Sequence, residues 1–347
     1  MRSFDADFAV PTGYLNTPSI GIPPAHVADA VEDAVSHWRR GAAAPPDFDR
    51  YVAVAREAFA RLVGVPGDTV AIGASVSQLV GNVAAGTPDG TRVLVAGGEF
   101  TSVTFPFAAH AHRGVTVTEV PLGDLPGRVD GYDLVAVSVV QSADGSAVDL
   151  EQLRGAAAAS GARVLLDVTQ AAGWQPLRLA WADWVVGAGY KWLLSPRGAA
   201  WLAVRPDALE RTLPAGANWY AGEDPWSTVY GLPLRLARGA RGLDLSPVWF
   251  AQVGAAVALP YLASLDLAAV RAHCVELADR VLTGLGLPPR GSAILALDVG
   301  DAGFDRLRAS GVTASRRAGK VRLGFHLYNS PADAELVLDA FEGTRSG

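Results

Sequence analysis

Lys191 has the setting that most favours covalent chemistry in this sequence. It is one of two lysines among 29 basic residues, the other being Lys320, and it stands between Tyr190 and Trp192. Apolar surroundings lower the pKa of an amine, and only the neutral amine attacks an aldehyde. A surface lysine flanked by core aromatic residues is the structural alternative. Because lysine is so scarce here and arginine could not serve in this role, we favour the covalent one.

A second polar group follows an apolar run that is typical of a buried strand. Asp167 ends the run 164–166 and is followed by Thr169 and Gln170. Open parallel sheets bind ligands outside the carboxyl ends of their strands, which is where these side chains would lie. The structural alternative is an aspartate that only caps the next helix.

A third group could bind an anion. The segment Gly73-Ala74-Ser75 follows a short apolar run and precedes a helical pattern. Free backbone N–H groups at a helix N-terminus, together with a serine hydroxyl, bind phosphate without needing a cation. Such a segment taken alone is more often a simple helix cap, so it gains meaning only in the company of Asp167 and Lys191.

These groups need elements that place them at one edge of a sheet. From about 68 to 205, short apolar runs alternate with alanine-rich helical patterns, which is typical of repeated β–α units. The pattern predicts an α/β fold with a mostly parallel seven-stranded sheet in a large domain. Strands are expected at 70–72, 92–96, 115–120, 134–139, 163–166, 184–186 and 199–204, and helices at 76–85, 101–112, 150–160 and 249–264.

The remaining chain predicts a second, smaller unit. We assign 1–13 to an N-terminal segment, 14–262 to the large domain and 263–347 to a small C-terminal α+β domain. Residues 212–247 are rich in Gly, Pro and Trp and predict a long loop of the kind that often serves function. The last helix is expected to begin at Ser330 as N-cap with Pro331 in its first turn.

Composition limits the partners. Half of the 347 residues are hydrophobic, 18% are charged and the net charge is -6, which is typical of a globular protein and unlike a nucleic-acid binder. The apolar runs have strand length, and acidic residues near the start without a following apolar run predict no secretory signal. Cys274 is the only cysteine, so no internal disulfide or thiolate metal cluster can form. We expect a cytoplasmic protein that binds small molecules, with no metal, nucleic acid or membrane as partner.

The three chemical groups, in this order and at this spacing, resemble the pyridoxal-phosphate (PLP) enzymes of aminotransferase class V over nearly the whole chain. This superfamily of fold type I includes cysteine desulfurases, kynureninases, isopenicillin N epimerases and amino-acid C–S lyases. The resemblance implies a fold-type I transferase with pyridoxal 5'-phosphate as cofactor, a small amino-acid substrate and a homodimer.

The resemblance implies which part of the cofactor each of these residues would contact. Lys191 would form the Schiff base, and Asp167 would pair with the protonated pyridine nitrogen. Gln170 and Ser142 would lie near the ring hydroxyl. Phe100 would stack on the ring, although a core phenylalanine is the structural alternative for it.

The resemblance also implies the phosphate and substrate contacts. Gly73, Ala74 and Ser75 would hold the phosphate. Arg322 would bind the substrate carboxylate through two parallel hydrogen bonds, with a surface strand arginine as the structural alternative. Asn16 matches the N-terminal strip that reaches back to the active site.

Two features depart from the family pattern. Relatives often have a small polar residue that touches the phosphate two or three positions before the lysine, where this chain has Ala188 and Gly189. The Gly-Thr pair that relatives often lend across the dimer interface is also replaced, and Arg241 or Ser246 could substitute for it. Contacts from a partner subunit to the phosphate therefore stay open.

The sequence narrows the reaction without choosing one. Cysteine desulfurases use a mobile cysteine, whereas Cys274 lies in an expected helix at 267–284 and is interpreted as a small core residue. Transamination, epimerisation and loss of a leaving group from the β carbon all remain open. We favour a C–S lyase or an aminotransferase/epimerase of a modified amino acid. The alternative is a non-catalytic PLP- or ligand-binding protein of the same fold, which would have no need of Arg322.

Overall fold

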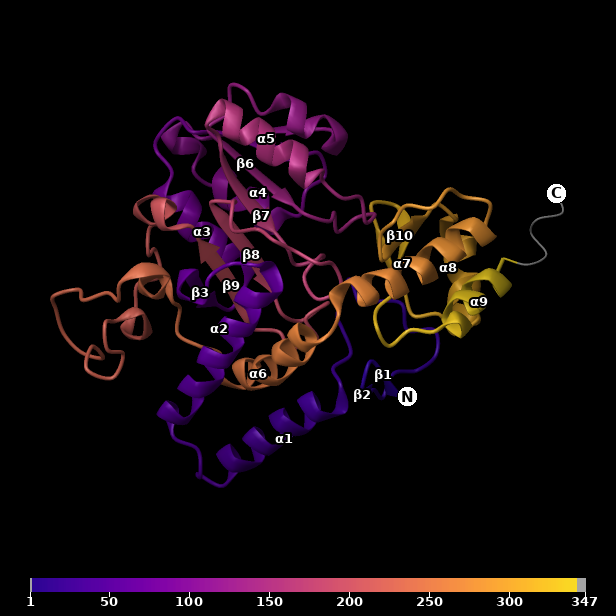
Figure 1. The fold of residues 1–347 in the computed structure, drawn as a ribbon, viewed down its shortest axis with the longest axis horizontal. Helices are drawn as coiled ribbons and strands as arrows, with labels where there is room; N and C mark the ends of the chain where they lie inside the picture. The colour runs from indigo at the N-terminus through magenta and orange to yellow at the C-terminus, as the bar shows by residue number, and fades with distance from the viewer. Residues whose placement is uncertain (1, 342–347) are drawn as a thin grey trace.

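The computed structural model describes residues 2–341, which form a large and a small sheet with helices packed around them (Figure 1). The large sheet has seven strands in the order β3-β9-β8-β7-β6-β4-β5. Strands β4 to β8 run parallel, and β9 is antiparallel to both of its neighbours. The strands are β3 Val70–Gly73, β4 Arg92–Ala96, β5 Thr116–Val120, β6 Leu134–Ser138, β7 Arg163–Asp167, β8 Trp184–Ala188 and β9 Ala200–Val204. The predicted α/β fold and its seven-stranded sheet are confirmed, with strand ends shifted by at most two residues.

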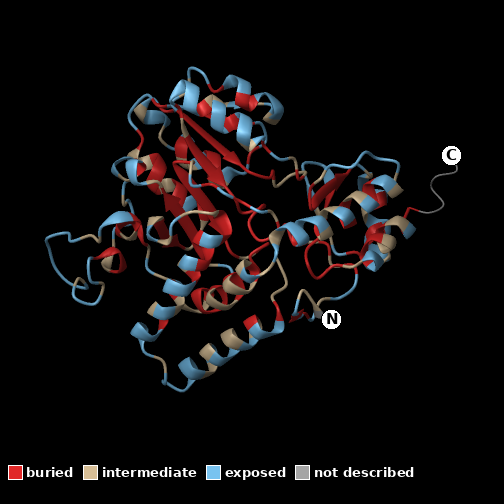
Figure 2. Cartoon of the chain, viewed as in Figure 1, coloured by how far each residue is buried: buried red, intermediate tan, exposed pale blue. Residues whose placement is uncertain are grey.

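Helices cover both faces of this sheet. One face packs against α2 (Asp49–Val63), α5 (Leu150–Ser160) and α6 (Trp249–Ser264), and the other against α3 (Val76–Gly86) and α4 (Thr101–Ala108). Successive strand residues alternate between the two cores, as Leu165 and Leu166 do. The central strands are therefore apolar on both sides, and Figure 2 shows them buried beneath helices with exposed outer faces.

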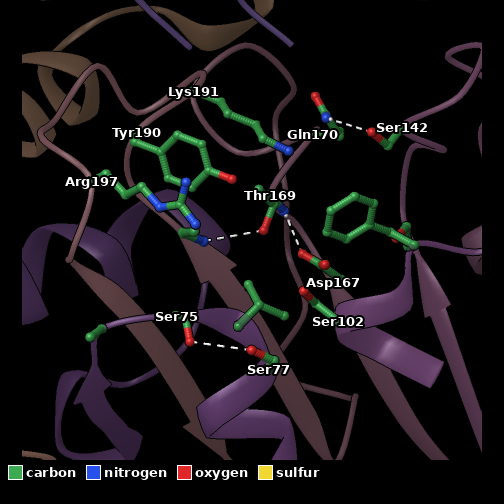
Figure 3. A pocket seen from close by; sticks show the side chains of 15 residues that line it. Ser75, Ser77, Ser102, Ser142, Asp167, Thr169, Gln170, Tyr190, Lys191 and Arg197 are labelled. Atoms are coloured by element: carbon green, nitrogen blue, oxygen red, sulfur yellow. Dashed lines mark hydrogen bonds between the residues drawn. The ribbon is translucent and has the colours of Figure 1, made fainter. Parts of the chain in front are cut away.

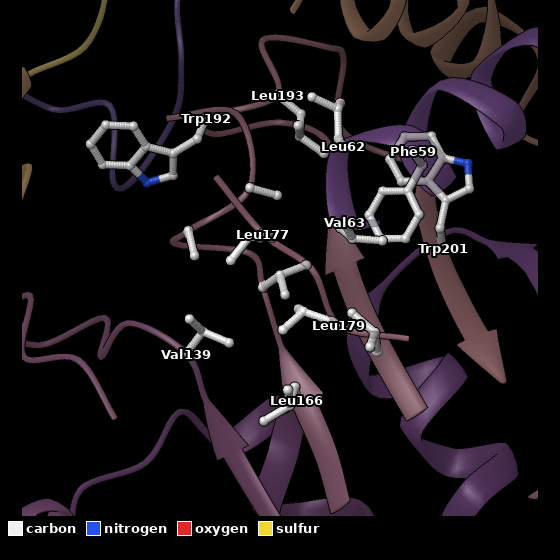
Figure 4. Packing of buried hydrophobic residues seen from close by; sticks show 14 of the residues in the cluster. Phe59, Leu62, Val63, Val139, Leu166, Leu177, Leu179, Trp192, Leu193 and Trp201 are labelled. Carbon is white, nitrogen blue, oxygen red and sulfur yellow. The ribbon is translucent and has the colours of Figure 1, made fainter. Parts of the chain in front are cut away.

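Two long helices were not among the expected elements. They are α1 (Ala25–Arg39) and α2, and α2 buries its apolar stripe against the sheet. In Figure 4, Phe59 of α2 lies on Trp201 of β9, with ring centroids 5.1 Å apart and planes 18° from parallel. Helix α4 is shorter than predicted, because after Ala108 the backbone tightens into a 3₁₀ turn at Ala111–Arg113.

The small sheet belongs to a second core. Its order is β10-β12-β11, all antiparallel, and the surrounding helices are α7, α8 and α9. The bounds are α7 Leu267–Gly284, β10 Ile294–Leu297, α8 Gly300–Ala309, β11 Ser315–Arg317, β12 Lys320–Gly324 and α9 Pro331–Asp339. Ser330 and Asp333 form a capping box at the start of α9, where the N-cap was predicted.

The N-terminal part of the chain returns to this small sheet. After the short pair β1 (Arg2–Ser3) and β2 (Ala6–Asp7), Tyr14 bridges to Thr313 and Asn16 bridges to Gly324. Leu15, between them, is fully buried in the small core. Residues 14–16 thus lie along the small sheet.

The irregular segment 212–247 is tied to the edge of the large sheet through Asp244. Its carboxylate accepts both Nη groups of Arg56, at 2.9 and 2.7 Å, and the backbone N–H of Ile72 at 2.9 Å. Leu245 N–H donates to Ile72 O at 2.9 Å. The segment 212–247 contains two 3₁₀ turns, at Trp219–Ala221 and Gly239–Leu243. The residues between these turns form an exposed excursion (Figure 1).

Within the described residues, no single helix is long and apolar enough to cross a membrane. Taken together, α6 and α7 reach the needed length and composition, but they are bent by 91° relative to each other.

Candidate active site

A pocket opens at the carboxyl ends of the parallel strands, between the ends of β6, β7 and β8 and the first turns of α3 and α4 (Figure 3). Its lining residues are Ala74, Ser75, Val76, Ser77, Phe100, Ser102, Ser138, Ser142, Asp167, Thr169, Gln170, Ala188, Tyr190, Lys191 and Arg197. Of the expected site residues, those brought together here are Ala74, Ser75, Phe100, Ser142, Asp167, Gln170 and Lys191. Gly73, Asn16 and Arg322 lie outside this lining.

Lys191 is buried in the pocket wall, in the loop that follows β8. Its side chain is 6% exposed, and its Nζ lies 5.3 Å from the ring centroid of Phe100 and 5.5 Å from that of Tyr190. Burial lowers the pKa of Lys191 to about 8, against the opposing attraction of the Asp167 carboxylate. A substantial fraction of this amine is therefore neutral near physiological pH.

Asp167 is the last residue of β7 and lies at the floor of the pocket. It accepts the backbone N–H of Thr169 at 2.8 Å, and the Thr169 hydroxyl in turn accepts the N–H of Ala188 at 3.2 Å. Burial raises the pKa of Asp167 to about 6, although hydrogen bonding to Thr169 opposes the shift. A cationic partner inside the pocket would restore the carboxylate by relieving this cost.

The segment before α3 forms the predicted anion cradle. Ser75 is the N-cap of α3, accepting the N–H of Gln78 at 3.4 Å, and its hydroxyl lies 3.3 Å from that of Ser77. A Cβ added to Gly73 would lie 2.8 Å from the Leu79 side chain, so the glycine lets the helix pack closely on β3. The free N–H groups at the start of α3 thus face the pocket beside two hydroxyls.

Phe100 reaches the pocket as the residue before α4, and the buried Glu99 holds it there. The Glu99 carboxylate accepts the N–H of Phe100 at 2.8 Å, the N–H and hydroxyl of Ser138 at 2.8 and 2.6 Å, and the Gln141 amide at 2.9 Å. These bonds join the β4–α4 loop to the end of β6. They fix the backbone from which the Phe100 ring, 43% exposed, faces Lys191.

Gln170 and Ser142 join the pocket to the small domain. The Gln170 amide donates to Pro18 O and to the Ser142 hydroxyl, both at 3.1 Å, and its carbonyl accepts the Trp192 indole N–H at 2.7 Å. Both side chains line the pocket, but their polar atoms already have protein partners. Their expected contact with a ring hydroxyl stays a prediction.

Arg322 lies behind Ser142, 1% exposed, on β12. It donates to Ser142 O at 2.5 Å, to the hydroxyls of Ser142 and Ser19 at 2.9 and 2.8 Å, and to that of Ser315 at 3.2 Å. Burial lowers its pKa to about 10, so it is still a cation at neutral pH. Its side-chain partners among residues 2–341 are all neutral, and its Nε has none.

Asn16 lies on the strip that pairs with β12, bridged to Gly324. Its Oδ1 is buried and has no hydrogen-bond partner among the described residues. Its assignment to the substrate, like that of Arg322, stays a prediction.

The sequence analysis assigned no part in the site to five lining residues, Ser77, Ser102, Ser138, Tyr190 and Arg197. Thr169, which follows Asp167 by two residues, lies at the strand end where the sequence placed it. Arg197 could not have been found, because arginine is common in this sequence and its position follows from the shape of a loop.

Sequence comparison identifies related proteins. The family model for aminotransferase class V matches residues 40–290. An uncharacterized aminotransferase, YcbU of Bacillus subtilis, is 27% identical over 312 residues, covering 82% of this chain and 81% of the relative. The isopenicillin N epimerase of Streptomyces clavuligerus is 28% identical over 301 residues, covering 76% and 72%.

Solved structures have the same fold. A cysteine desulfurase from Thermococcus onnurineus superimposes with a TM-score of 0.86 at 20% identity, covering 99% of this chain and 98% of that one. The cystine C–S lyase C-DES, in complex with its reaction product cysteine persulfide, superimposes with a TM-score of 0.82 at 18% identity, covering 95% and 97%.

The donor set fits pyridoxal phosphate. A buried amine of lowered pKa suits the aldehyde, a buried carboxylate suits a protonated ring nitrogen, and the start of α3 suits the phosphate. Fold and site together define a PLP-dependent enzyme of fold type I, a lyase or transferase. The chain belongs to the aminotransferase class-V family.

Proposed function

We propose that this enzyme is an amino-acid C–S lyase acting on a modified, sulfur-bearing amino acid, with PLP held on Lys191 as a Schiff base. Transamination and epimerisation are the competing outcomes at the same site. The observation that carries the assignment to an amino-acid substrate is Arg322, a buried guanidinium whose side-chain partners are all hydroxyls and a carbonyl. An unpaired buried charge is costly, and a substrate carboxylate would relieve that cost.

When bound, PLP supplies an electron sink for negative charge developing at the α carbon. The residues of this chain supply the rest. Arg322 binds the carboxylate, and Asp167 holds the proton on the pyridine nitrogen. Lys191 Nζ, as a neutral amine, would accept the α proton of the substrate. The electron pair left at the α carbon would form the Cα–Cβ double bond as the C–S bond breaks with its own pair leaving on sulfur, and the proton held by Lys191 would pass to the thiolate. Water would then hydrolyse the resulting enamine to pyruvate and ammonia.

The burial of Cys274 bears on how sulfur leaves the substrate. It is the only cysteine in the sequence, lies fully buried in α7, and has a pKa raised strongly by burial. This thiol is in no position to take sulfur from a substrate, because a persulfide relay needs an exposed, ionised thiol. We therefore favour direct release of a thiol or persulfide product, in the way that the lyase C-DES yields cysteine persulfide.

The test uses the purified enzyme with S-substituted cysteines. A lyase releases the thiol, pyruvate and ammonia in equal amounts. A transaminase releases a 2-oxo acid that keeps the sulfur, and an epimerase exchanges the α proton for deuterium without consuming the amino acid. Either of these two results, without pyruvate, would overturn the lyase assignment.

The matched control is Lys191→Ala. It should lose turnover, the visible absorption band of the bound cofactor and the borohydride-reduced adduct that peptide mapping locates on Lys191 in the parent protein. A normal adduct without turnover on any amino acid would instead favour the non-catalytic PLP-binding alternative.

We also propose that the enzyme is a homodimer. Support comes from the excursion of segment 212–247, where Tyr230, Leu232 and Leu234 are 88%, 90% and 64% exposed. Such apolar side chains on one protruding segment are typical of an interface. Light scattering after gel filtration should give twice the mass of the chain, and replacing all three by serine should shift the enzyme toward monomer.

A further inference from the structure

Arg197 is an unpaired cation in the wall of the pocket. It is exposed, and within residues 2–341 its guanidinium forms no ion pair and no hydrogen bond to another protein group. Its contact is with Tyr190, whose ring centroid lies 5.3 Å from the guanidinium carbon. Other arginines of this protein hold carboxylates, as Arg56 holds Asp244 and Arg92 holds Asp133. Arg197 is thus positioned by an aromatic ring while its five donors stay available.

The loop that carries Arg197 is fixed against the lysine strand. Ser195 N–H donates to Gly189 O at 3.0 Å, and Gly189 N–H donates to Ala199 O at 2.9 Å. Leu194 has a φ of 54°, a left-handed conformation that is unfavourable for an apolar residue. A loop that keeps this strain is held by its surroundings, so it returns to the pocket in a defined position.

The packing of this loop also explains why glycine stands at position 189, in the turn after β8. A Cβ on Gly189 would lie 2.1 Å from the Ser195 hydroxyl oxygen, so that space is already taken by the loop. A residue larger than glycine at 189 would require the Ser195 hydroxyl to turn away, and its Cβ would lie 3.3 Å from the Trp201 ring. The loop that closes off that space also presents Arg197 to the pocket.

Among the charged side chains that line the pocket, Arg197 is the one to which the site has so far assigned no partner. The ionised lining groups are Asp167, Lys191 and Arg197. A phosphate ester carries close to two negative charges, whereas the cradle offers two hydroxyls and the N–H groups of α3. Lys191 is committed to the aldehyde. In Figure 3, Arg197 extends along the Tyr190 ring, and Ser75 and Ser77 lie below it in this view, across the space that the lining residues surround.

We propose that Arg197 binds the phosphate of PLP, completing an anion site formed by Ser75, Ser77 and the N-terminus of α3. The phosphate would then accept charge-assisted hydrogen bonds from a planar guanidinium held by Tyr190. The proposal rests on the cofactor and not on the choice among lyase, transaminase and epimerase.

The test compares two probes that differ only in the phosphate. PLP is removed from the full-length holoenzyme with hydroxylamine, and the protein is titrated with PLP or with pyridoxal. We expect Arg197→Gln to weaken PLP binding about tenfold or more, since the variant loses charge-assisted hydrogen bonds to the phosphate. Pyridoxal affinity should be unchanged, and Arg197→Lys should recover part of the loss. The control is Arg178→Gln, an exposed arginine outside the pocket, which should alter neither affinity.

Two results would overturn the proposal. PLP affinity could be unchanged in Arg197→Gln, and a rise in the KM of the amino acid would then assign Arg197 to the substrate. Alternatively, PLP and pyridoxal could weaken equally, which would indicate a role in positioning Tyr190 and the ring. Circular dichroism of each variant checks that the fold is retained, and Arg197→Lys keeps the test decisive if the glutamine variant fails to fold.

Discussion

Removing the Asp244 carboxylate should destabilise the protein far more than removing an exposed carboxylate with a similar partner. Asp244 has a fully buried side chain that accepts three hydrogen bonds of 2.7–2.9 Å, two of them from Arg56, whose side chain is 14% exposed. Asp244→Ala would leave that guanidinium buried and unpaired, a change that costs about 3–5 kcal/mol. An unfolding entropy of roughly 2.1 cal/mol/K per residue converts this loss to a melting temperature lower by about 4–7 °C.

The assay is thermal unfolding followed by circular dichroism, with Asp133→Ala as the control. Asp133 pairs with Arg92 at 3.0 Å, but these side chains are 47% and 54% exposed, and such pairs contribute about 0–1 kcal/mol. The double variant Arg56→Met/Asp244→Leu should recover much of the loss, because the buried guanidinium is then removed with its partner and, of the other charged groups, only the 40% exposed Arg241 loses a contact. Equal shifts for Asp244→Ala and Asp133→Ala would refute the reasoning that burial makes the Arg56–Asp244 pair important.

Three further outcomes follow from the site. Since burial lowers the pKa of Lys191 to about 8, the apoprotein should react with PLP faster as pH rises through 8, as the amine loses its proton; a midpoint near 10 would contradict this. Arg322→Gln should raise the KM of the amino acid at least tenfold while PLP affinity is kept, as titration with PLP would show. Cys274→Ala should keep C–S cleavage in a turnover assay, with at most a modest loss of stability, and a folded but inactive variant would restore a role for this thiol.

The strands of the large sheet could be predicted because parallel strands covered on both faces are nearly continuous apolar runs, such as 163–166. Their order could not. β3 pairs with β9, which comes far later in the chain, and no local pattern encodes that pairing. Helix α2 was missed although its signal is readable, since apolar residues recur at helical spacing in 49–63.

The site residues also divide into those that could be predicted from the sequence and those that could not. Asp167 and Lys191 could be found because their types are unusual at the end of an apolar run. Glu99 could not, because its role depends on Ser138 and Gln141, which the sheet brings to it from another strand. Arg197 is one arginine among many in the sequence, and only the folded loop shows that it has no carboxylate partner in the part of the chain that the structure describes.

The antiparallel strand β9 also determines when the cofactor site can exist during synthesis. Strands β4 to β8 pair with neighbours that lie near them in the chain, so most of the sheet can form early. The cradle after β3 has no strand to hold it until Ala200–Val204 has left the ribosome. A nascent chain ending before this strand would contain both Asp167 and Lys191 and still have no support for a phosphate. We therefore expect cofactor capture to be a late event, coupled to the pairing of β9 with β3 at the edge of the sheet.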